Sequence, residues 1–219
     1  MLVSREQYLA NRKEREERRE AQQERSNVRF MTVPSDGEAI VRLAPLDENE
    51  IIYFHTETDD WKSRKIACLR EDFRSPITDC PFCAAKMPLK SRYYVKLIHY
   101  ERDDDGNVVA TPKVWDAPAR YVSVLSDREE EYGPVQDMIY KMKRTGTGQT
   151  TTYDFLPMMS KLYNDDVYVK DFSGLENYKA LGTVVKELSA EEMKSLLSGE
   201  PVKETPQTPV QTQPRRVTY

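Results

Sequence analysis

The feature that most constrains this chain is a set of four metal-binding residue types within the short segment 55–83. One histidine and all three cysteines give the pattern H-x12-C-x11-C-x2-C. Zinc favours four soft or borderline donors in a tetrahedron, and a C-x2-C turn lets two thiolates bind one ion. Three thiolates and one imidazole fill that shell, so the pattern predicts a single structural Zn²⁺ rather than an ion that activates water. The predicted ligands are His55, Cys68, Cys80 and Cys83. The alternative is three reduced core cysteines and an unrelated histidine.

Composition limits the class of protein. The 219 residues have room for one domain with tails or for two small domains, and because only 38% of them are hydrophobic we expect part of the chain not to pack. An odd number of cysteines and the lack of a signal peptide indicate a reducing compartment, so we expect a cytoplasmic protein, in the host-cell cytoplasm if it is viral. No run approaches the ~18 apolar residues of a membrane span. The net charge of -4 sums opposing patches and does not exclude an anionic partner.

The chain divides by composition into four parts. Residues 1–26 predict a charged helical arm, in which acidic and basic residues nearly balance. Residues 27–158 predict a β-rich core that contains a zinc subdomain at about 55–90. Residues 159–199 predict a C-terminal extension, of which residues 160–185 are expected to cover one side of the core, with a short helix capped by a Ser-x-x-Glu box. Residues 200–219, rich in Pro, Gln and Thr, predict a disordered tail.

Alternating hydrophobicity predicts short strands in the core. These strands cover about residues 39–43, 51–56, 91–100, 108–115, 135–144 and 150–156. A helix is predicted within 119–131, before Gly133-Pro134. Strands, then one helix, then strands again is the order of an OB-fold, a five-stranded Greek-key barrel, so the fold class is mainly β with some α. The zinc set falls in a long connection between early strands, which we expect to be irregular and held by the metal.

The strand at 91–100 predicts a binding face. Arg92, Tyr94, Lys96 and Tyr100 share one side of it by alternation. Single-stranded nucleic acid is bound by such a mixture, because bases stack on aromatic rings for ~1–3 kcal/mol each and cations contact phosphates. The predicted nucleic-acid-binding residues are Arg42, Arg92, Tyr94, Lys96, Tyr100, Lys113, Trp115, Lys143, Arg144 and Tyr153. The alternative is that the rings are core residues and the cations are simply solvated.

These residues resemble a known family. The order Val41-Arg42-Leu43-Ala44-Pro45, His55, Cys68, Cys80-Pro81-Phe82-Cys83, Ser91-Arg92-Tyr93-Tyr94 and Lys113-Val114-Trp115 is similar to that of T-even-type phage single-stranded DNA-binding, helix-destabilising proteins. The resemblance covers roughly residues 28–158, and its specific part is the zinc set.

The resemblance implies an OB-fold with a zinc subdomain and a cleft that takes single strands without sequence preference. It also implies a role in coating and protecting DNA during phage replication, recombination and repair, together with self-association along the strand and contacts with replication and recombination proteins. Such proteins carry a basic arm and an acidic tail, whereas this arm is nearly neutral and this tail also contains Lys203, Arg215 and Arg216.

Two other readings compete with DNA binding. The first is a zinc nucleobase deaminase, because His55-Thr56-Glu57 and the Cys-x-x-Cys pair partly match the sequence signature of such enzymes. Against it, the proline follows the first cysteine rather than preceding it, and Cys68 supplies a fourth ligand where catalysis needs water. We therefore expect no enzyme. The other reading is a zinc-stapled protein-interaction module whose aromatic residues are core.

Overall fold

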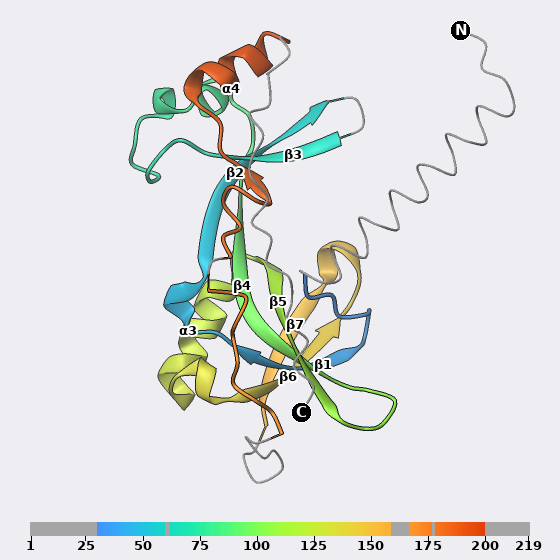
Figure 1. Ribbon diagram of the computed structural model, residues 1–219. Helices are drawn as coiled ribbons and strands as arrows, with labels where there is room; N and C mark the ends of the chain where they lie inside the picture. The colour runs from blue at the N-terminus through green and yellow to red at the C-terminus, as the bar shows by residue number, and fades with distance from the viewer. Residues whose placement is uncertain (1–29, 60–61, 159–166, 177, 200–219) are drawn as a thin grey trace, which may run out of the picture.

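The computed structural model describes residues 30–59, 62–158, 167–176 and 178–199 (Figure 1). Its strands are β1 (Glu38–Leu43), β2 (Glu50–Asp59), β3 (Lys62–Ala67), β4 (Leu89–Arg102), β5 (Val108–Pro118), β6 (Ile139–Thr145), β7 (Thr152–Pro157) and β8 (Val185–Lys186). Its α-helices are α2 (Pro81–Ala84), α3 (Tyr121–Tyr132) and α4 (Ala190–Leu197). The predicted arm and tail lie outside the described residues.

Strand β4 organises the sheet because it is long enough to hold two strands end to end. Its 14 residues span roughly 45 Å at ~3.4 Å per residue. One edge pairs with β5 over its length from Arg92 onward. The other edge pairs first with β2 and then with β1. In Figure 1, β4 therefore runs from the lower part of the molecule, beside α3, to the upper part that carries α4.

The described strands form one open, mostly antiparallel sheet rather than the predicted closed five-stranded barrel. Its order is β7-β6-β1-β4-β2-β3-β8, with β5 on the free edge of β4. Among the named strands only the β3–β8 pair is parallel. No ladder of the described residues joins β5 to β7. The sheet continues past β1 into β2 and β3, and this continuation makes the class mixed α/β with eight strands.

Several element boundaries differ from the predicted ones. Strand β6 begins at Ile139 rather than near residue 135, because Pro134 leads into a 3-10 turn at Val135–Asp137. Strand β3 was not predicted and lies in the connection expected to be irregular. The predicted helix is confirmed as α3, which ends at Gly133, where φ is 91°. A positive φ there favours glycine.

The main core lies on the side of the sheet that faces α3. Tyr93, Val95 and Leu97 of β4 point into it. Trp115 of β5 lies at its centre, with ring centroids 4.9 Å from Tyr121 of α3 and 5.0 Å from Tyr153 of β7. These edge-to-face contacts bring β5 and β7 together through side chains.

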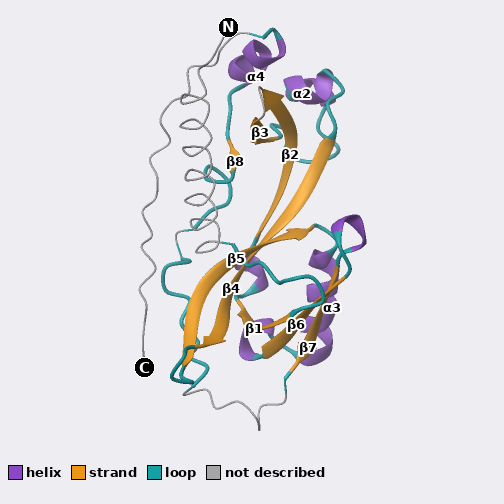
Figure 2. Ribbon diagram, turned by 90° about the vertical axis from the view of Figure 1, so that its right-hand side faces the viewer, coloured by secondary structure: helices purple, strands orange, loops and turns teal. Residues whose placement is uncertain are grey.

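The opposite side of β4 is covered by residues 168–176 and 178–180 of the C-terminal extension, which we call the covering segment. Tyr94 packs with Leu175 and Tyr178 in one cluster, and Tyr100 packs with Tyr168 in another. Figure 2 shows this segment running along the sheet as loop up to β8. Burial on both sides explains why every residue from Tyr93 to Tyr100 is buried. The described residues of the extension thus pack against one side of β4, through Tyr168, Leu175 and Tyr178.

His99 is a buried histidine whose neutral form is favoured in the folded protein. Lys113 Nζ donates to its Nδ1 at 3.0 Å. Burial, followed by the Lys113 charge, lowers the pKa of His99 to about 4, although Glu101 opposes the shift. The unfolded chain, with a histidine pKa of about 6.5, therefore binds a proton between pH 6.5 and 4 that the folded protein does not.

We expect acid to destabilise the protein partly through His99. The free energy of unfolding should fall as pH drops below about 6.5, by about 2 kcal/mol from this residue at pH 5. His99→Gln should remove that part, so its melting temperature should change less between pH 7 and pH 5 than that of the wild type. Both proteins retain the cysteine cluster, so its contribution to acid sensitivity is the same in each and cancels when the two changes in melting temperature are compared. Equal acid sensitivity in the two proteins would rule this account out.

Candidate metal centre and candidate nucleic-acid face

Three elements bring the four predicted ligands together. His55 lies in β2, Cys68 directly follows β3, and Cys80 and Cys83 belong to the start of α2. The Cys68 N–H donates to the Tyr53 carbonyl at 2.9 Å, which keeps Cys68 in register beside β2. Pro81 occupies the first position of α2, where its fixed φ suits a helix start and its missing N–H costs nothing. The two cysteines of the pair are thereby turned toward the same point.

The ligand atoms form a cluster of the size that a metal ion requires. All four lie within 4.8 Å of one another. Cys68 Sγ is 3.6 Å from Cys83 Sγ, and His55 Nε2 is 3.6 Å from Cys80 Sγ and 3.4 Å from Cys83 Sγ. A tetrahedron with metal–sulfur distances of ~2.3 Å has edges of about 3.8 Å. The Cys3His cluster could therefore hold a metal ion such as zinc.

His55 is held in the tautomer that metal binding needs. Its Nδ1 lies 3.2 Å from the Pro88 carbonyl, an acceptor, so the ring proton belongs on Nδ1 and the lone pair of Nε2 faces the three sulfurs. Burial lowers the pKa of His55, and carbonyl contacts with Pro88 and Met87 only partly oppose this. The neutral imidazole that ligates metal is thus the favoured form.

The pKa values of the Cys68 and Cys80 thiols are shifted in opposite directions. Burial, together with the neighbouring Cys83 and Cys80 sulfurs and against a backbone hydrogen bond at Arg70, raises the pKa of Cys68 to about 12. Burial also acts on Cys80, but hydrogen bonds from the backbone N–H groups of Leu69, Cys83 and Phe82 outweigh it and lower the pKa of Cys80. A divalent cation at the centre would favour thiolates at all three positions.

The cluster is covered by the C-terminal helix. Met193 of α4 is fully buried against Cys80, Phe82 and Ile66. Helix α4 starts with the predicted capping box, in which the Ser189 hydroxyl accepts from the Glu192 N–H and the Glu192 carboxylate accepts from the Ser189 N–H. This upper part of the molecule, which we call the metal lobe, comprises the β2–β3 hairpin, α2 and α4.

Several predicted nucleic-acid residues lie in the protein interior. Tyr94, Tyr100 and Trp115 have exposed fractions of 1%, 4% and 2%, so in this conformation their rings are not accessible to a base. Arg42 is 3% exposed, and its guanidinium donates to the Gln136 and Tyr168 carbonyls. Lys96 is also buried. Contact of these residues with DNA stays a prediction. For Tyr94 and Tyr100 it would require the covering segment to move, whereas Trp115 lies in the core on the α3 side of the sheet.

The register also separates residues that were expected on one face. Trp115 lies opposite Val95 and Lys113 opposite Leu97, on the core side of β4 rather than beside Arg92. Tyr153 is half-buried in the same core. Lys143 is exposed on β6, while Arg144 donates to the Val33 carbonyl at 2.7 Å.

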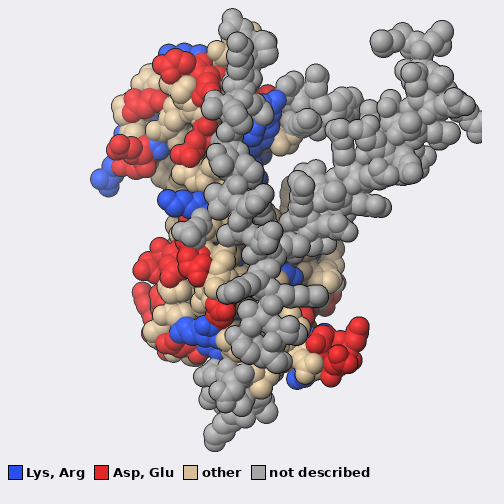
Figure 3. Space-filling view, viewed as in Figure 1, with Lys and Arg blue, Asp and Glu red and all other residues tan. Residues whose placement is uncertain are grey.

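A smaller group of accessible cations remains on the other side of the sheet. Lys90 and Arg92 of β4 share that side with Lys65 of β3, as the registers of β2 with β3 and β4 require. Sequence reasoning missed Lys65 and its partner Asp116. The alternation of Ser63, Lys65 and Ala67 with Arg64 and Ile66 was the signal that could have identified this strand. Figure 3 shows acidic and basic side chains intermixed on the visible face, with acidic ones gathered at the β4–β5 turn.

An exposed aromatic pair was missed as well. The rings of Tyr53 and Phe73 meet edge to face at 4.8 Å, with exposed fractions of 39% and 64%. Phe73 lies in a tight turn between Cys68 and Cys80, where the Asp72 carboxylate accepts from the N–H groups of Arg74 and Ser75.

Comparison with protein-family models gives no match, and comparisons with curated proteins and with solved structures give none either. Among the described residues, no helix is long and apolar enough to cross a membrane.

Proposed function

We propose that this protein binds single-stranded DNA without sequence preference and coats it during phage DNA replication, recombination and repair. The observation that carries the proposal is the convergence of His55, Cys68, Cys80 and Cys83 into one metal-sized cluster. These four residues supply the specific part of the resemblance to T-even-type DNA-binding proteins, and a coincidental match in sequence would not require them to meet. We propose that the ion is a single structural Zn²⁺.

The strand connectivity supports an OB-type core within the larger sheet. Strands β5, β4, β1, β6 and β7 are consecutive neighbours, and α3 lies between β5 and β6 in the chain. The end strands β5 and β7 approach through the ring contacts of Trp115 with Tyr153 and Phe155. This strand order supports the proposal of an OB-type Greek-key core, although among the described residues no ladder joins β5 to β7.

The accessible cations of β3 and β4 support an anionic ligand. Lys90 is exposed, and Arg92 and Lys65 keep 32% and 30% of their side-chain surface exposed. Their side chains lie on one side of the sheet, where successive phosphates of an extended strand could be contacted. We propose no catalytic role, because the four ligands would leave zinc without an open position.

The test is titration of a labelled thymine oligomer with the purified protein, followed by fluorescence anisotropy. Affinity should fall with salt, with a log–log slope of about -0.7 per phosphate contact. A matched duplex should bind much more weakly. Lys90→Gln should make the slope less negative by about 0.7, whereas Lys194→Gln, an exposed lysine on α4, should leave it unchanged. No binding to the single strand, or a slope near zero, would contradict the proposal.

A protein-interaction module is the second candidate. The observation that favours it is the exposed pair of Tyr53 and Phe73 beside the metal cluster, with Ile77 of the same loop 58% exposed. Exposed aromatic groups of this kind are typical of docking surfaces. This candidate predicts that Phe73→Ser changes partner binding and leaves the salt slope for DNA unaffected.

A further inference from the structure

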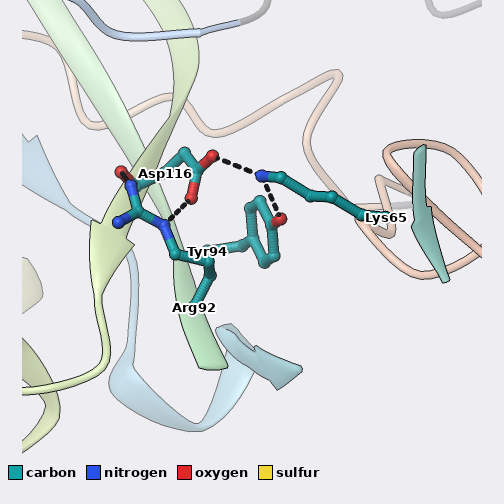
Figure 4. Close-up of polar contacts among 4 residues, drawn as sticks. All are labelled: Lys65, Arg92, Tyr94 and Asp116. Atoms are coloured by element: carbon teal, nitrogen blue, oxygen red, sulfur yellow. Dashed lines mark hydrogen bonds and ion pairs between the residues drawn. The ribbon is translucent and has the colours of Figure 1, made fainter. Parts of the chain in front are cut away.

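The carboxylate of Asp116 is held between two cations that come from different strands (Figure 4). Arg92 Nε lies 2.6 Å from Asp116 Oδ1, and Lys65 Nζ lies 2.9 Å from Oδ2. Arg92 Nη2 also donates to the backbone carbonyl of Asp116 at 2.6 Å. The two oxygens of one carboxylate thus each take a different positive charge, as two oxygens of a phosphate would.

The Lys65 side chain extends from β3 past β2 to β4, along one side of the sheet. It starts on β3, and its Nζ lies 5.3 Å from the centroid of the Phe54 ring on β2 and 5.5 Å from that of Tyr94 on β4. The Tyr94 hydroxyl accepts from Nζ at 3.1 Å. Contacts with two ring faces and one hydroxyl hold the ammonium group independently of the carboxylate. The lysine would therefore keep its place if the carboxylate left.

Arg92 is held independently as well. Its bond to the Asp116 backbone carbonyl does not involve the carboxylate. Both cations are therefore positioned by groups other than the side chain that neutralises them, which is the preorganisation that an anion site requires.

The cluster is partly open to solvent. The side chains of Lys65, Arg92 and Asp116 are 30%, 32% and 28% exposed. Lys90, two residues before Arg92 on the same side, is exposed and donates to Thr56 Oγ1 at 3.2 Å. Glu50, a carboxylate on this side, already accepts from the Ala180 N–H.

We infer that Arg92 and Lys65 form a phosphate-binding site for the DNA backbone, and that the Asp116 carboxylate is an internal competitor which occupies this site when DNA is absent. The inference rests on the proposed function and adds its regulation. A phosphodiester replaces the carboxylate between the two cations, so one ion pair is exchanged for another. The net electrostatic gain is smaller than for free cations, and Asp116 thereby limits the affinity for single strands.

The test compares Asp116→Asn with the wild type in the same thymine-oligomer titration. The amide keeps the size and the backbone carbonyl but removes the competing charge. Affinity at fixed salt should rise about threefold to tenfold, and the log–log slope should become more negative by up to about 1.4, or 0.7 for each released cation. Adding Lys65→Gln to Asp116→Asn should reverse about half of the change in slope.

Asp137→Asn is the matched control. Asp137 is also an aspartate paired with a lysine, at 2.6 Å from Lys170 Nζ, and its loss changes the net charge equally. It should leave affinity and slope near the wild-type values. An Asp116→Asn protein that melts like the wild type but binds with equal or lower affinity would overturn the inference, even if the wild type binds DNA well. Failure of the wild type to bind would overturn the proposed function itself and the inference with it.

If Asp116→Asn folds poorly, the affinity of the single variant Lys65→Gln for the thymine oligomer tests whether the carboxylate competes. The single substitution should weaken binding by less than Lys90→Gln does, because Lys65 is already partly neutralised by Asp116. An equal or larger loss of affinity would show that the carboxylate does not compete.

Discussion

Replacing Cys80 with serine should remove the metal from the protein and lower its melting temperature by about 6–12 °C. Cys80 is fully buried beside Phe82 and Met193, so losing the ion loosens both the cluster and the helix that covers it. A structural zinc contributes directly to folding free energy. A loss of about 3 kcal/mol corresponds to the stated shift at 2–4 °C per kcal/mol for a chain of this length. Zinc content by atomic emission and melting by circular dichroism are the measurements.

Asp79→Asn is the control for Cys80→Ser. Asp79 is exposed and immediately precedes Cys80, and it is not one of the clustered ligand residues. The control should retain about one zinc per chain and melt like the wild type. Complete loss of zinc from Cys80→Ser with unchanged melting would contradict the structural role, and retention of zinc would contradict Cys80 as a ligand.

Replacing Trp115 with alanine should cost about 3–5 kcal/mol of unfolding free energy, because a buried indole leaves a cavity that its neighbours do not fill. The melting temperature should fall by about 6–20 °C at 2–4 °C per kcal/mol. Trp115 is 2% exposed and touches the rings of Tyr121, Tyr153 and Phe155, which join three elements of the core. Tyr132→Ala, at a 49% exposed aromatic position, should change stability by less than about 0.5 kcal/mol.

The milder variant Trp115→Phe separates packing from DNA contact. An aromatic ring is retained in the core, so most of the stability should remain. If Trp115 acts through packing, affinity for the thymine oligomer should stay within twofold of the wild type. A protein that is stable but binds tenfold more weakly would instead favour the stacking role that the sequence suggested.

The ligand set could be predicted from sequence because its chemistry is local. Cysteine and histidine bind metal wherever a tight turn brings them together, and the Cys80-to-Cys83 spacing encodes that turn. The helix α4 was likewise predictable, since its capping box lies within four residues. In both cases the determining interactions lie close together in the chain.

The faces of β4 could not be predicted in the same way. Alternation correctly separates Tyr94 from Tyr93, but it does not say which side is buried when both are. Tyr94 is covered by Leu175 and Tyr178, and Tyr100 by Tyr168, which follow them in the chain by 68 positions or more. The Lys65 to Asp116 contact spans 51 positions and depends on a strand that the sequence reading overlooked. Packing against residues far away in the chain therefore determines which side chains of β4 are buried and where Lys65 lies.

The covering of the metal lobe by α4 has a consequence for synthesis on the ribosome. His55, Cys68, Cys80 and Cys83 emerge early, but Val185 of β8 and Met193 of α4, which complete the lobe, follow about a hundred residues later. A chain grows at ~5–20 residues per second, so the thiols wait several seconds without their final cover. During translation the cluster is therefore a set of accessible thiols, open to metal or oxidant, and it is covered only after α4 has been synthesised.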